Sequence, residues 1–264
     1  YYNHDQGYLP HFPGVESFKG QCVHPQHWPE GLIYKGKRVV VIGSGATAVT
    51  LIPAMADDAA HITMLQRSPS YVYSLPAMDK AAGLLRGLLP ESWVYALFRK
   101  RNIHLQRAIY KLCRRFPKQM RALLLRSVRK QVGENFDMRH FTPKYMPWDE
   151  RLCAVPNGDL FKVLREGKAS VVTDHIERFT EKGILLKSGQ ELEADIIVTA
   201  TGLQVQTIGG MTLSLDGQER RLNDRMTYKG VLVEDVPNFA YLFGYTNSSW
   251  TLKIDIAADY VCRV

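Results

Sequence analysis

A short glycine-rich stretch, Gly43-Ser44-Gly45-Ala46-Thr47-Ala48, has the residue types and spacing that suit a pyrophosphate. The first glycine permits a tight turn, the second lets backbone approach the phosphates, and the small Ala48 allows close packing of a helix on a strand. The N-terminus of the helix that follows offers free N–H groups to phosphate oxygens. We therefore predict dinucleotide binding through residues 43–47. An ordinary tight turn between a strand and a helix is the alternative.

The residues that follow the next expected strand indicate which nucleotide binds. A site for NAD or FAD usually has Asp or Glu there to bind the ribose 2′-hydroxyl, whereas this chain has Arg67-Ser68. A guanidinium can pair bidentately with a 2′-phosphate. We predict that Arg67 and Ser68 help to bind NADPH. The alternative is a solvated arginine at the end of a strand.

Hydrophobic periodicity places these motifs in an α/β fold. Residues 37–42 and 61–66 read as buried strands on either side of a helix at 47–55, which Pro53 should kink or shorten. Apolar residues at helical spacing predict a helical insertion over 76–150. Further strands are expected at 169–173, 176–179, 184–187 and 195–199, with a turn at 187–190. A hairpin around Asp216-Gly217 and a final helix at 252–264 complete the expected elements.

A second pattern lies just upstream of the glycine-rich stretch. Its specified positions form Phe-x-Gly-x-x-x-His-x-x-x-Trp-Pro, and the residues that match are Phe18, Gly20, His24, Trp28 and Pro29. This pattern resembles the signature of Baeyer–Villiger monooxygenases. From residue 1 to residue 264 the chain is similar to the mycobacterial, ethionamide-activating type of this family. In the family the signature belongs to a hinge that couples NADPH binding to domain rearrangement, and the resemblance implies that role for these five residues.

The resemblance implies a flavoenzyme that uses FAD, NADPH and O₂ to insert an oxygen atom beside the carbonyl of a ketone, or to oxidise a thioether. It implies a Rossmann-like α/β NADPH-binding domain with a helical insertion, followed by the return part of a second, FAD-binding domain. The expected division is a linker at 1–36, the NADPH domain at 37–75 and 151–200, the insertion at 76–150 and the FAD-domain part at 201–264. No FAD-type G-x-G-x-x-G occurs in the chain, so we expect FAD binding to need an absent N-terminal segment.

Three further site assignments follow from the resemblance. Arg151 is the expected catalytic residue, because a permanently charged donor can stabilise the negative charge of oxygen transfer; an ion pair with Asp149 or Glu150 is the alternative. The strand at 195–199 ends in small residues that would let backbone approach a cofactor, and Asn247 would contact the flavin or cap the final helix. The residues that end this strand are Ala200, Thr201 and Gly202.

Charge and cysteine content exclude other classes of protein. The net charge is +8, but residues 92–133 hold 12 Lys/Arg and no acid, so the remainder has 22 Lys/Arg against 26 Asp/Glu. This uneven distribution argues against a nucleic-acid-binding surface. The basic segment has three readings: a solvated face, a contact with anionic membranes, or an electrostatic collector for NADPH. Four scattered cysteines favour reduced thiols, with no metal site expected. We expect a cytoplasmic protein, with peripheral membrane contact through 92–133 left open.

Two other functions remain as alternatives to ketone oxygenation. A flavin-containing monooxygenase that oxidises nitrogen or sulfur shares the glycine motif, but its signature lacks the terminal Trp-Pro seen at residues 28–29. The isolated chain could also be an NADPH-binding module without activity. The identity of the substrate leaves no readable mark in the sequence.

Overall fold

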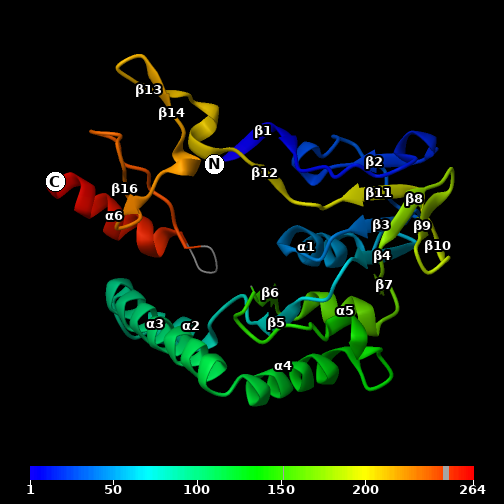
Figure 1. Ribbon diagram of the computed structural model, residues 1–264. Coiled ribbons are helices and arrows are strands. Elements are labelled where there is room, and N and C mark those ends of the chain that lie inside the picture. Colours follow the sequence, from blue (N-terminus) through cyan, green and yellow to red (C-terminus); the bar gives the residue numbers. More distant parts are fainter. Residues whose placement is uncertain (151, 246–249) are drawn as a thin grey trace. The chain divides into compact units, whose positions relative to one another are not determined.

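The chain forms two compact units in the computed structural model, which describes residues 1–150, 152–245 and 250–264. The larger unit comprises Tyr8–Gly202, and the smaller one combines Tyr1–Gly7 with Leu203–Val264. The chain therefore passes between the units twice, after Gly7 and after Gly202. Figure 1 shows the elements of both units, coloured along the sequence.

A five-stranded parallel sheet is the centre of the larger unit, with the strand order β2-β11-β3-β4-β7 (Figure 1). Each pair of neighbours in this sheet runs parallel. Parallel neighbours with helical crossovers are the arrangement predicted by the alternation of apolar runs, so the predicted α/β fold class is confirmed. The strands are β2 (Gln21–Val23), β11 (Ile196–Thr199), β3 (Arg38–Ile42), β4 (His61–Gln66) and β7 (Ala169–Thr173).

Each face of the parallel sheet is covered by a different layer. Val39 and Val41 point into one apolar cluster with α1 (Ala46–Met55) and α5 (Asp159–Arg165), whereas Val40 and Ile42 point into another. This alternation follows from the two-residue period of a strand. The second cluster lies under an antiparallel sheet of β8 (Ile176–Phe179), β9 (Gly183–Leu186) and β10 (Glu191–Glu193). Pro53 lies inside α1, which ends two residues later at Met55.

Residues 1–36, expected as a linker, contain two strands. β1 (Tyr2–Gly7) pairs antiparallel with β12 (Leu203–Val205) in the smaller unit, and β2 is the edge strand of the parallel sheet in the larger unit. The segment expected as a linker therefore contributes one strand to each unit. A strand as short as β2 shows no hydrophobic period, and its hydrogen bonds to β11 come from backbone groups that the sequence does not distinguish. Two 3₁₀ turns, Val15–Ser17 and Pro25–His27, flank β2.

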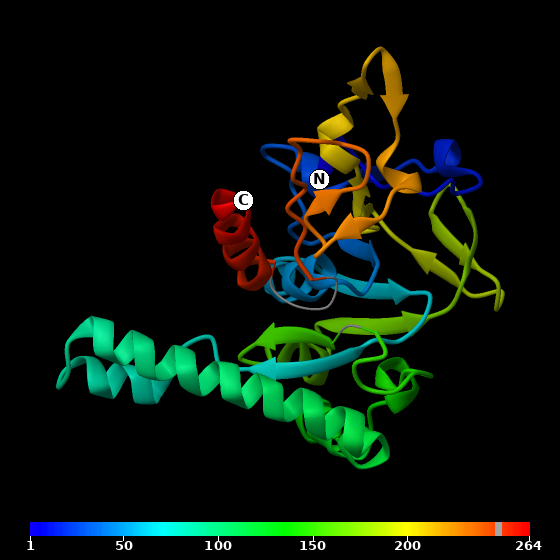
Figure 2. The ribbon, with the colours of Figure 1, turned by 60° about the vertical axis from the view of Figure 1, so that its left-hand side comes forward.

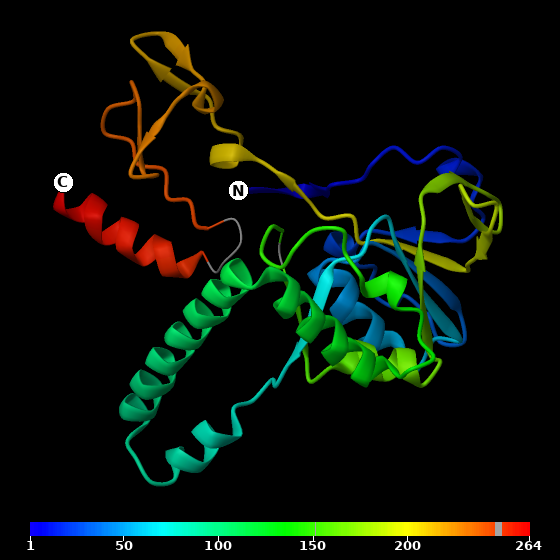
Figure 3. The same cartoon turned by 60° about the horizontal axis from the view of Figure 1, so that its bottom comes forward.

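Helices occupy most of the segment where helical spacing predicted them. They are α2 (Lys80–Arg86), α3 (Glu91–Arg115), α4 (Pro117–Val132) and a 3₁₀ turn at Met138–Phe141. α4 packs on α5 and β5 and buries Val128 and Val132, whereas α3 packs mainly on α2 and α4. Figures 2 and 3 show α3, with α2 beside it, extending from the α/β layers of the larger unit as an arm. β5 (Tyr71–Leu75) and β6 (Leu152–Pro156), which were not predicted, form a parallel pair on either side of these helices.

The smaller unit is built from short elements. β13 (Leu213–Leu215) and β14 (Gln218–Arg220) form the predicted hairpin, and Asp216 and Gly217 at its turn have φ angles of 52° and 78°. Positive φ at both central residues is the requirement of a type I′ turn, which Asp-Gly satisfies. β15 (Thr227–Tyr228) pairs with β16 (Leu232–Val233), and two 3₁₀ turns lie at Thr207–Gly210 and Leu222–Asp224. The predicted final helix is α6 (Thr251–Arg263).

Candidate dinucleotide site

The turn after β3 requires glycine for a steric reason. Gly43 has a φ of 127°, and a Cβ atom built on it would lie 2.4 Å from the carbonyl oxygen of Ala200. Its own N–H donates to the carbonyl of Leu65 at 2.8 Å. The turn is therefore held between the carboxyl ends of β11 and β4, and any side chain at this position would push them apart.

The N-terminus of α1 is open in the way that a phosphate site requires. Gly45 is the N-cap residue in an extended conformation, and no side chain caps the helix. A Cβ on Gly45 would meet no atom within 4 Å, so the space in front of it is open. Ala46 and Thr47 are exposed on the first turn, whereas Ala48 is fully buried against the sheet. Uncapped N–H groups and the positive end of the helix dipole together fit a pyrophosphate.

Arg67 and Ser68 lie at the same edge of the sheet as this turn. Ile42 of β3 is in register with Leu65 of β4, so the residues after both strands emerge side by side. Both Arg67 and Ser68 are exposed, and within the described parts of the chain Arg67 forms no ion pair. The guanidinium of Arg67 is therefore available to an anionic group bound at this edge.

A buried polar cluster, which the sequence did not predict, is formed around Gln66, the residue directly before Arg67. Gln66 is only 2% exposed, and its Nε2 donates to the carbonyl of His140 at 2.7 Å and to the hydroxyl of Thr173 at 2.9 Å. The same hydroxyl lies 2.7 Å from Nδ1 of His140. Burial lowers the pKa of His140, which favours its neutral form. A glutamine that ends an otherwise apolar strand was the available signal, because a buried amide needs hydrogen-bond partners.

Residues 200–202 lie against the glycine turn and at the passage between the units. The carbonyl of Ala200 faces Gly43, as the contact above shows. The hydroxyl of Thr201 donates to the carbonyl of Tyr8 at 2.5 Å, and the N–H of Tyr8 donates to the carbonyl of Gly202 at 3.1 Å. Both bonds lie within the larger unit. They join Tyr8 to residues 201–202, the two places where the chain passes from this unit to the smaller one.

His24 makes a further contact at this passage. Its Nε2 lies 3.2 Å from the carbonyl oxygen of Gly202, and its Nδ1 lies 3.2 Å from the N–H of Gln26. A carbonyl only accepts and an N–H only donates, so the neutral imidazole with hydrogen on Nε2 satisfies both contacts. His24 therefore contacts the end of the 200–202 segment.

The rest of the signature wraps around the edge of the parallel sheet. Phe18 packs against the apolar cluster on one face and contacts Phe179 edge-on at 6.4 Å, whereas Trp28 packs against the cluster on the other face. A Cβ on Gly20 would lie 2.4 Å from the carbonyl oxygen of Asp195, so glycine is required for this close approach. Pro29 is exposed beyond Trp28. The segment that carries the signature thus runs from one face of the parallel sheet, at Phe18, to the other face, at Trp28.

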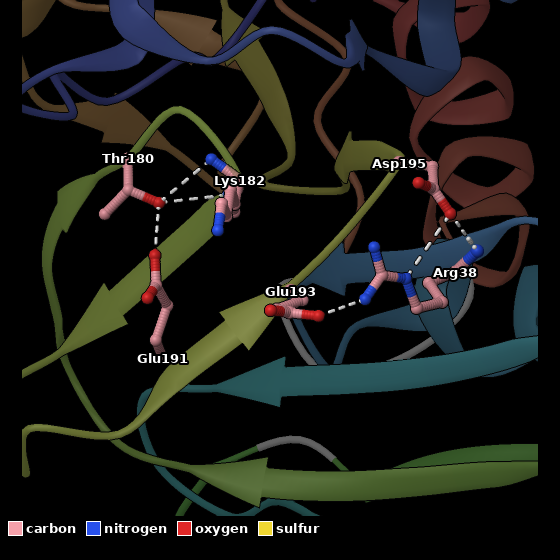
Figure 4. Close-up of polar contacts among 7 residues, drawn as sticks. Arg38, Thr180, Lys182, Glu191, Glu193 and Asp195 are labelled. Atoms are coloured by element: carbon pink, nitrogen blue, oxygen red, sulfur yellow. Dashed lines mark hydrogen bonds and ion pairs between the residues drawn. The ribbon is translucent and has the colours of Figure 1, made fainter.

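Asp195 anchors the opposite, amino-terminal edge of the same strands (Figure 4). Its carboxylate accepts the backbone N–H of Arg38 at 2.8 Å, and this bond, with smaller contributions from the Arg38 guanidinium, lowers the pKa of the Asp195 carboxyl. The Arg38 guanidinium also pairs with Glu193 of β10. Nearby in Figure 4, the hydroxyl of Thr180 donates to Glu191 at 2.6 Å. These contacts fix the strands far from the glycine turn and have a structural role.

Two predicted site residues, Arg151 and Asn247, lie outside the described residues. The segment before Arg151 is described. It contains Asp149, one of the two acids that could pair with Arg151 if that arginine had no catalytic role. Asp149 pairs with Arg114 at 2.7 Å and also accepts the N–H of Met146. Trp148 has a φ of 71°, a strained value for a bulky residue. Strain of this kind is often retained next to functional residues.

These features are typical of dinucleotide-binding α/β folds, with an open helix N-terminus at the carboxyl edge of a parallel sheet. The family model for flavin-binding monooxygenase-like proteins matches residues 3–208. The chain belongs to this flavin-binding monooxygenase-like family.

Curated relatives support the same family over the full chain. The chain is 66% identical to the putative FAD-containing monooxygenase MymA of Mycobacterium tuberculosis and 57% identical to the probable FAD-binding monooxygenase AlmA of Acinetobacter baylyi. It is 56% identical to the FAD-containing monooxygenase EthA of Mycolicibacterium smegmatis. Each match covers 100% of this chain but only 53–54% of the relative, so the chain spans about half the length of these proteins.

Solved structures share the fold. A steroid monooxygenase bound to NADP superposes with a TM-score of 0.70 and 23% identity, over 97% of this chain and 58% of that one. Cyclohexanone monooxygenase in an open crystal structure gives a TM-score of 0.64 and 20% identity, over 98% and 61% of the two chains.

In residues 1–150, 152–245 and 250–264 we find no helix long and apolar enough to cross a membrane.

Proposed function

We propose that this chain forms the NADPH-binding part of a FAD- and NADPH-dependent monooxygenase. The observation that carries the proposal is the open N-terminus of α1, set between Gly43 and the exposed Arg67 at one edge of the sheet. The helix N-terminus would hold the pyrophosphate, and Arg67 would pair with the 2′-phosphate that distinguishes NADPH from NADH. Ser44, Ala46, Thr47 and Ser68 would contribute backbone or hydroxyl donors beside them.

The reaction we propose is the transfer of one oxygen atom of O₂ to a ketone, with thioethers as a second class of substrate. The signature at residues 18–29 supports this reaction over oxidation of nitrogen, because the terminal Trp28-Pro29 is present. FAD, when bound, supplies the oxygen chemistry. The chain has one G-x-G-x-x-A motif, which we assign to NADPH, so we propose that FAD is held with a segment outside these 264 residues.

Specific residues of this chain would serve that reaction. We propose Arg151 as the donor that stabilises negative charge on the reacting oxygen atoms, since a guanidinium stays charged and has a forked geometry. Residues 200–202 and Asn247 would lie close to the cofactors. His24, bonded to Gly202 where the chain leaves the larger unit, would act in the hinge with the other signature residues. The domain division at 37–75, 76–150, 151–200 and 201–264 is part of the same proposal.

Oxygen uptake by the FAD-loaded protein that contains this chain tests the proposal. We expect NADPH-dependent O₂ consumption with formation of an ester or lactone from a ketone. Arg151→Lys should keep NADPH affinity but lose product formation, whereas Arg165→Lys, an exposed arginine on α5, should change neither. Unchanged turnover in Arg151→Lys would exclude its catalytic role.

Two other results would favour the alternatives. Oxygenation of amines or thioethers with no conversion of ketones would indicate a flavin-containing N/S-monooxygenase. A colourless protein that binds NADPH but consumes no O₂ would indicate a binding module.

A further inference from the structure

The α2–α3 arm, which we define as residues 80–115, presents large apolar side chains to solvent. Around its tip, where α2 joins α3, Leu84, Leu88 and Trp93 are 76%, 79% and 69% exposed. Leu97 on the next turn of α3 is 53% exposed. A cluster of large apolar side chains this exposed indicates an interaction surface rather than a misplaced core.

The exposed part of α3 is amphipathic along its length. Leu105, Ile109 and Leu112 are exposed and follow one another at spacings of four and three residues, which places them in one row on the helix. Lys100, Arg107 and Lys111 are also exposed, at spacings of seven and four, and their row lies on the opposite side of the helix. Trp93 belongs to this second row, because it precedes Lys100 by seven residues. Trp93 and the cations Lys100, Arg107 and Lys111 therefore face the same way, and an aromatic side chain beside cations suits the interface of an anionic membrane.

The charge of this region is of one sign and mostly unpaired. Residues 92–133 contain 12 Lys/Arg and no Asp or Glu. Of these cations, only Arg101 and Arg114 pair with acids in the described parts of the chain, through Asp79 and Asp149. Arg121 is partly buried and donates to the carbonyl of Tyr145 at 3.2 Å. The remaining cations are available to an external anionic surface.

We propose that the α2–α3 arm docks on the surface of an anionic phospholipid bilayer. Leu88 and Trp93 at the tip enter the interfacial layer, and the basic residues of α3 and α4 contact lipid phosphates. Because no helix of the described chain is apolar enough to span the bilayer, the arm lies on the membrane and does not cross it.

Two other occupants fit the surface less well. A nucleic acid would satisfy the cations but would leave the apolar side chains of Leu84, Leu88 and Trp93 in water. A second copy of the chain would cover apolar surface but would bring two basic segments together, each without an acid, and like charges repel. A bilayer with anionic headgroups satisfies both the apolar and the cationic parts of the surface.

Co-sedimentation of the chain with vesicles tests the proposal. Vesicles of phosphatidylcholine alone are compared with vesicles that also contain phosphatidylglycerol. We expect binding to the anionic vesicles, and weakening of that binding as added salt screens the charges. The triple variant Lys100→Gln/Arg107→Gln/Lys111→Gln should bind with roughly fivefold lower affinity for each cation removed.

A second variant isolates the apolar contribution. Leu88→Ser/Trp93→Ser changes side chains that are exposed, so the fold should be retained, yet vesicle binding should fall at least tenfold, as expected for two large apolar groups. Matched controls elsewhere on the surface are Lys35→Gln/Lys182→Gln/Lys187→Gln for charge and Ile33→Ser/Met226→Ser for apolar exposure. The controls should bind like the unmodified chain.

Several results would overturn the proposal. One is absence of binding to anionic vesicles, and another is equal binding to neutral ones. Binding that neither arm variant weakens would assign the contact to another surface. Binding that heparin abolishes and that Leu88→Ser/Trp93→Ser leaves unchanged would indicate a general polyanion site. Self-association measured by light scattering, lost in Leu88→Ser/Trp93→Ser and accompanied by no vesicle binding, would assign the arm to contact between copies.

Discussion

The glycine turn after β3 and the α2–α3 arm both present positive potential, but the potential comes from different atoms. At the turn it comes from the uncapped N–H groups of α1 and from one arginine, Arg67, held at the edge of a buried sheet. On the arm it comes from side-chain charges on exposed helices, with no acid from residue 92 to the end of the arm at residue 115. A net charge of +8 therefore says little about the nucleotide site, because that site depends on backbone geometry.

The two regions should also respond differently to substitution. The turn is sterically constrained, with the carbonyl of Ala200 too close to Gly43 for any side chain. The exposed positions of the arm have room around them, so changes there should alter binding of partners with little effect on folding. Substitutions at the turn and its supports should instead lower stability and nucleotide affinity together.

The largest effect is expected from Gly43→Val. Its Cβ would collide with the Ala200 carbonyl at a φ of 127°, so we expect a loss of about 3 kcal/mol in the free energy of unfolding and loss of NADPH binding. Gly36→Ala is the matched control: its φ is also positive, at 68°, but a Cβ there meets no atom within 4 Å. That control should cost about 1 kcal/mol and leave NADPH affinity unchanged. Urea denaturation measures the free energy of unfolding, and a fluorescence titration measures NADPH affinity. Equal effects of Gly43→Val and Gly36→Ala would show that the contact with the Ala200 carbonyl is not the cause.

A smaller loss of stability is expected from Gln66→Leu. It removes the donor shared by the His140 carbonyl and the Thr173 hydroxyl, leaving buried acceptors unsatisfied at a cost of about 1–3 kcal/mol. Arg67 follows directly, so NADPH affinity should fall as well. The same exchange at the exposed Gln119 of α4 should change neither quantity. If Gln66→Leu melts at the same temperature as the unmodified chain, the cluster has no supporting role.

The smallest of these effects is a pH dependence carried by His140. Burial lowers the pKa of this imidazole in the folded chain, whereas in the unfolded chain it titrates near its ordinary value of about 6.5. The unfolded state therefore takes up more protons as the pH falls through that value, and stability decreases below about pH 6.5. Urea denaturation above and below this pH, with His140→Gln for comparison, should show a shallower pH dependence in the variant. An identical pH dependence of stability in both proteins would show that His140 does not cause it.

Features that depend on local residue patterns were predicted from the sequence, whereas features that depend on backbone pairing or on contacts between distant segments were not. The runs at 37–42 and 61–66 are long, apolar and β-branched, so their strands were predicted within a residue, and Asp216-Gly217 predicted its turn from backbone chemistry alone. β2 was missed because three residues have no measurable period and are paired only through backbone. The division into two units at Gly7 and Gly202 depends on contacts between distant segments, which no local pattern records.

The candidate site shows the same limits. The glycine spacing predicted a turn whose geometry has a direct steric cause, and the structure places residues 200–202 beside it. The cluster of Gln66, His140 and Thr173 was not predicted, because its members lie far apart in sequence and are joined by the register of β4 with β7 and by the 3₁₀ turn that holds His140. A polar residue that ends a buried strand was the one local sign of it.

A titration of the chain with NADPH and NADH determines whether the carboxyl edge of the parallel sheet binds NADPH through Arg67. The unmodified chain should bind NADPH at least tenfold more tightly than NADH, and Arg67→Gln should lose that preference while keeping its affinity for NADH. Lys100→Gln/Arg107→Gln/Lys111→Gln, which removes three charges from the arm, should leave the preference unchanged. Comparable affinity of the unmodified chain for the two nucleotides, or a preference that survives in Arg67→Gln, would show that Arg67 does not select NADPH.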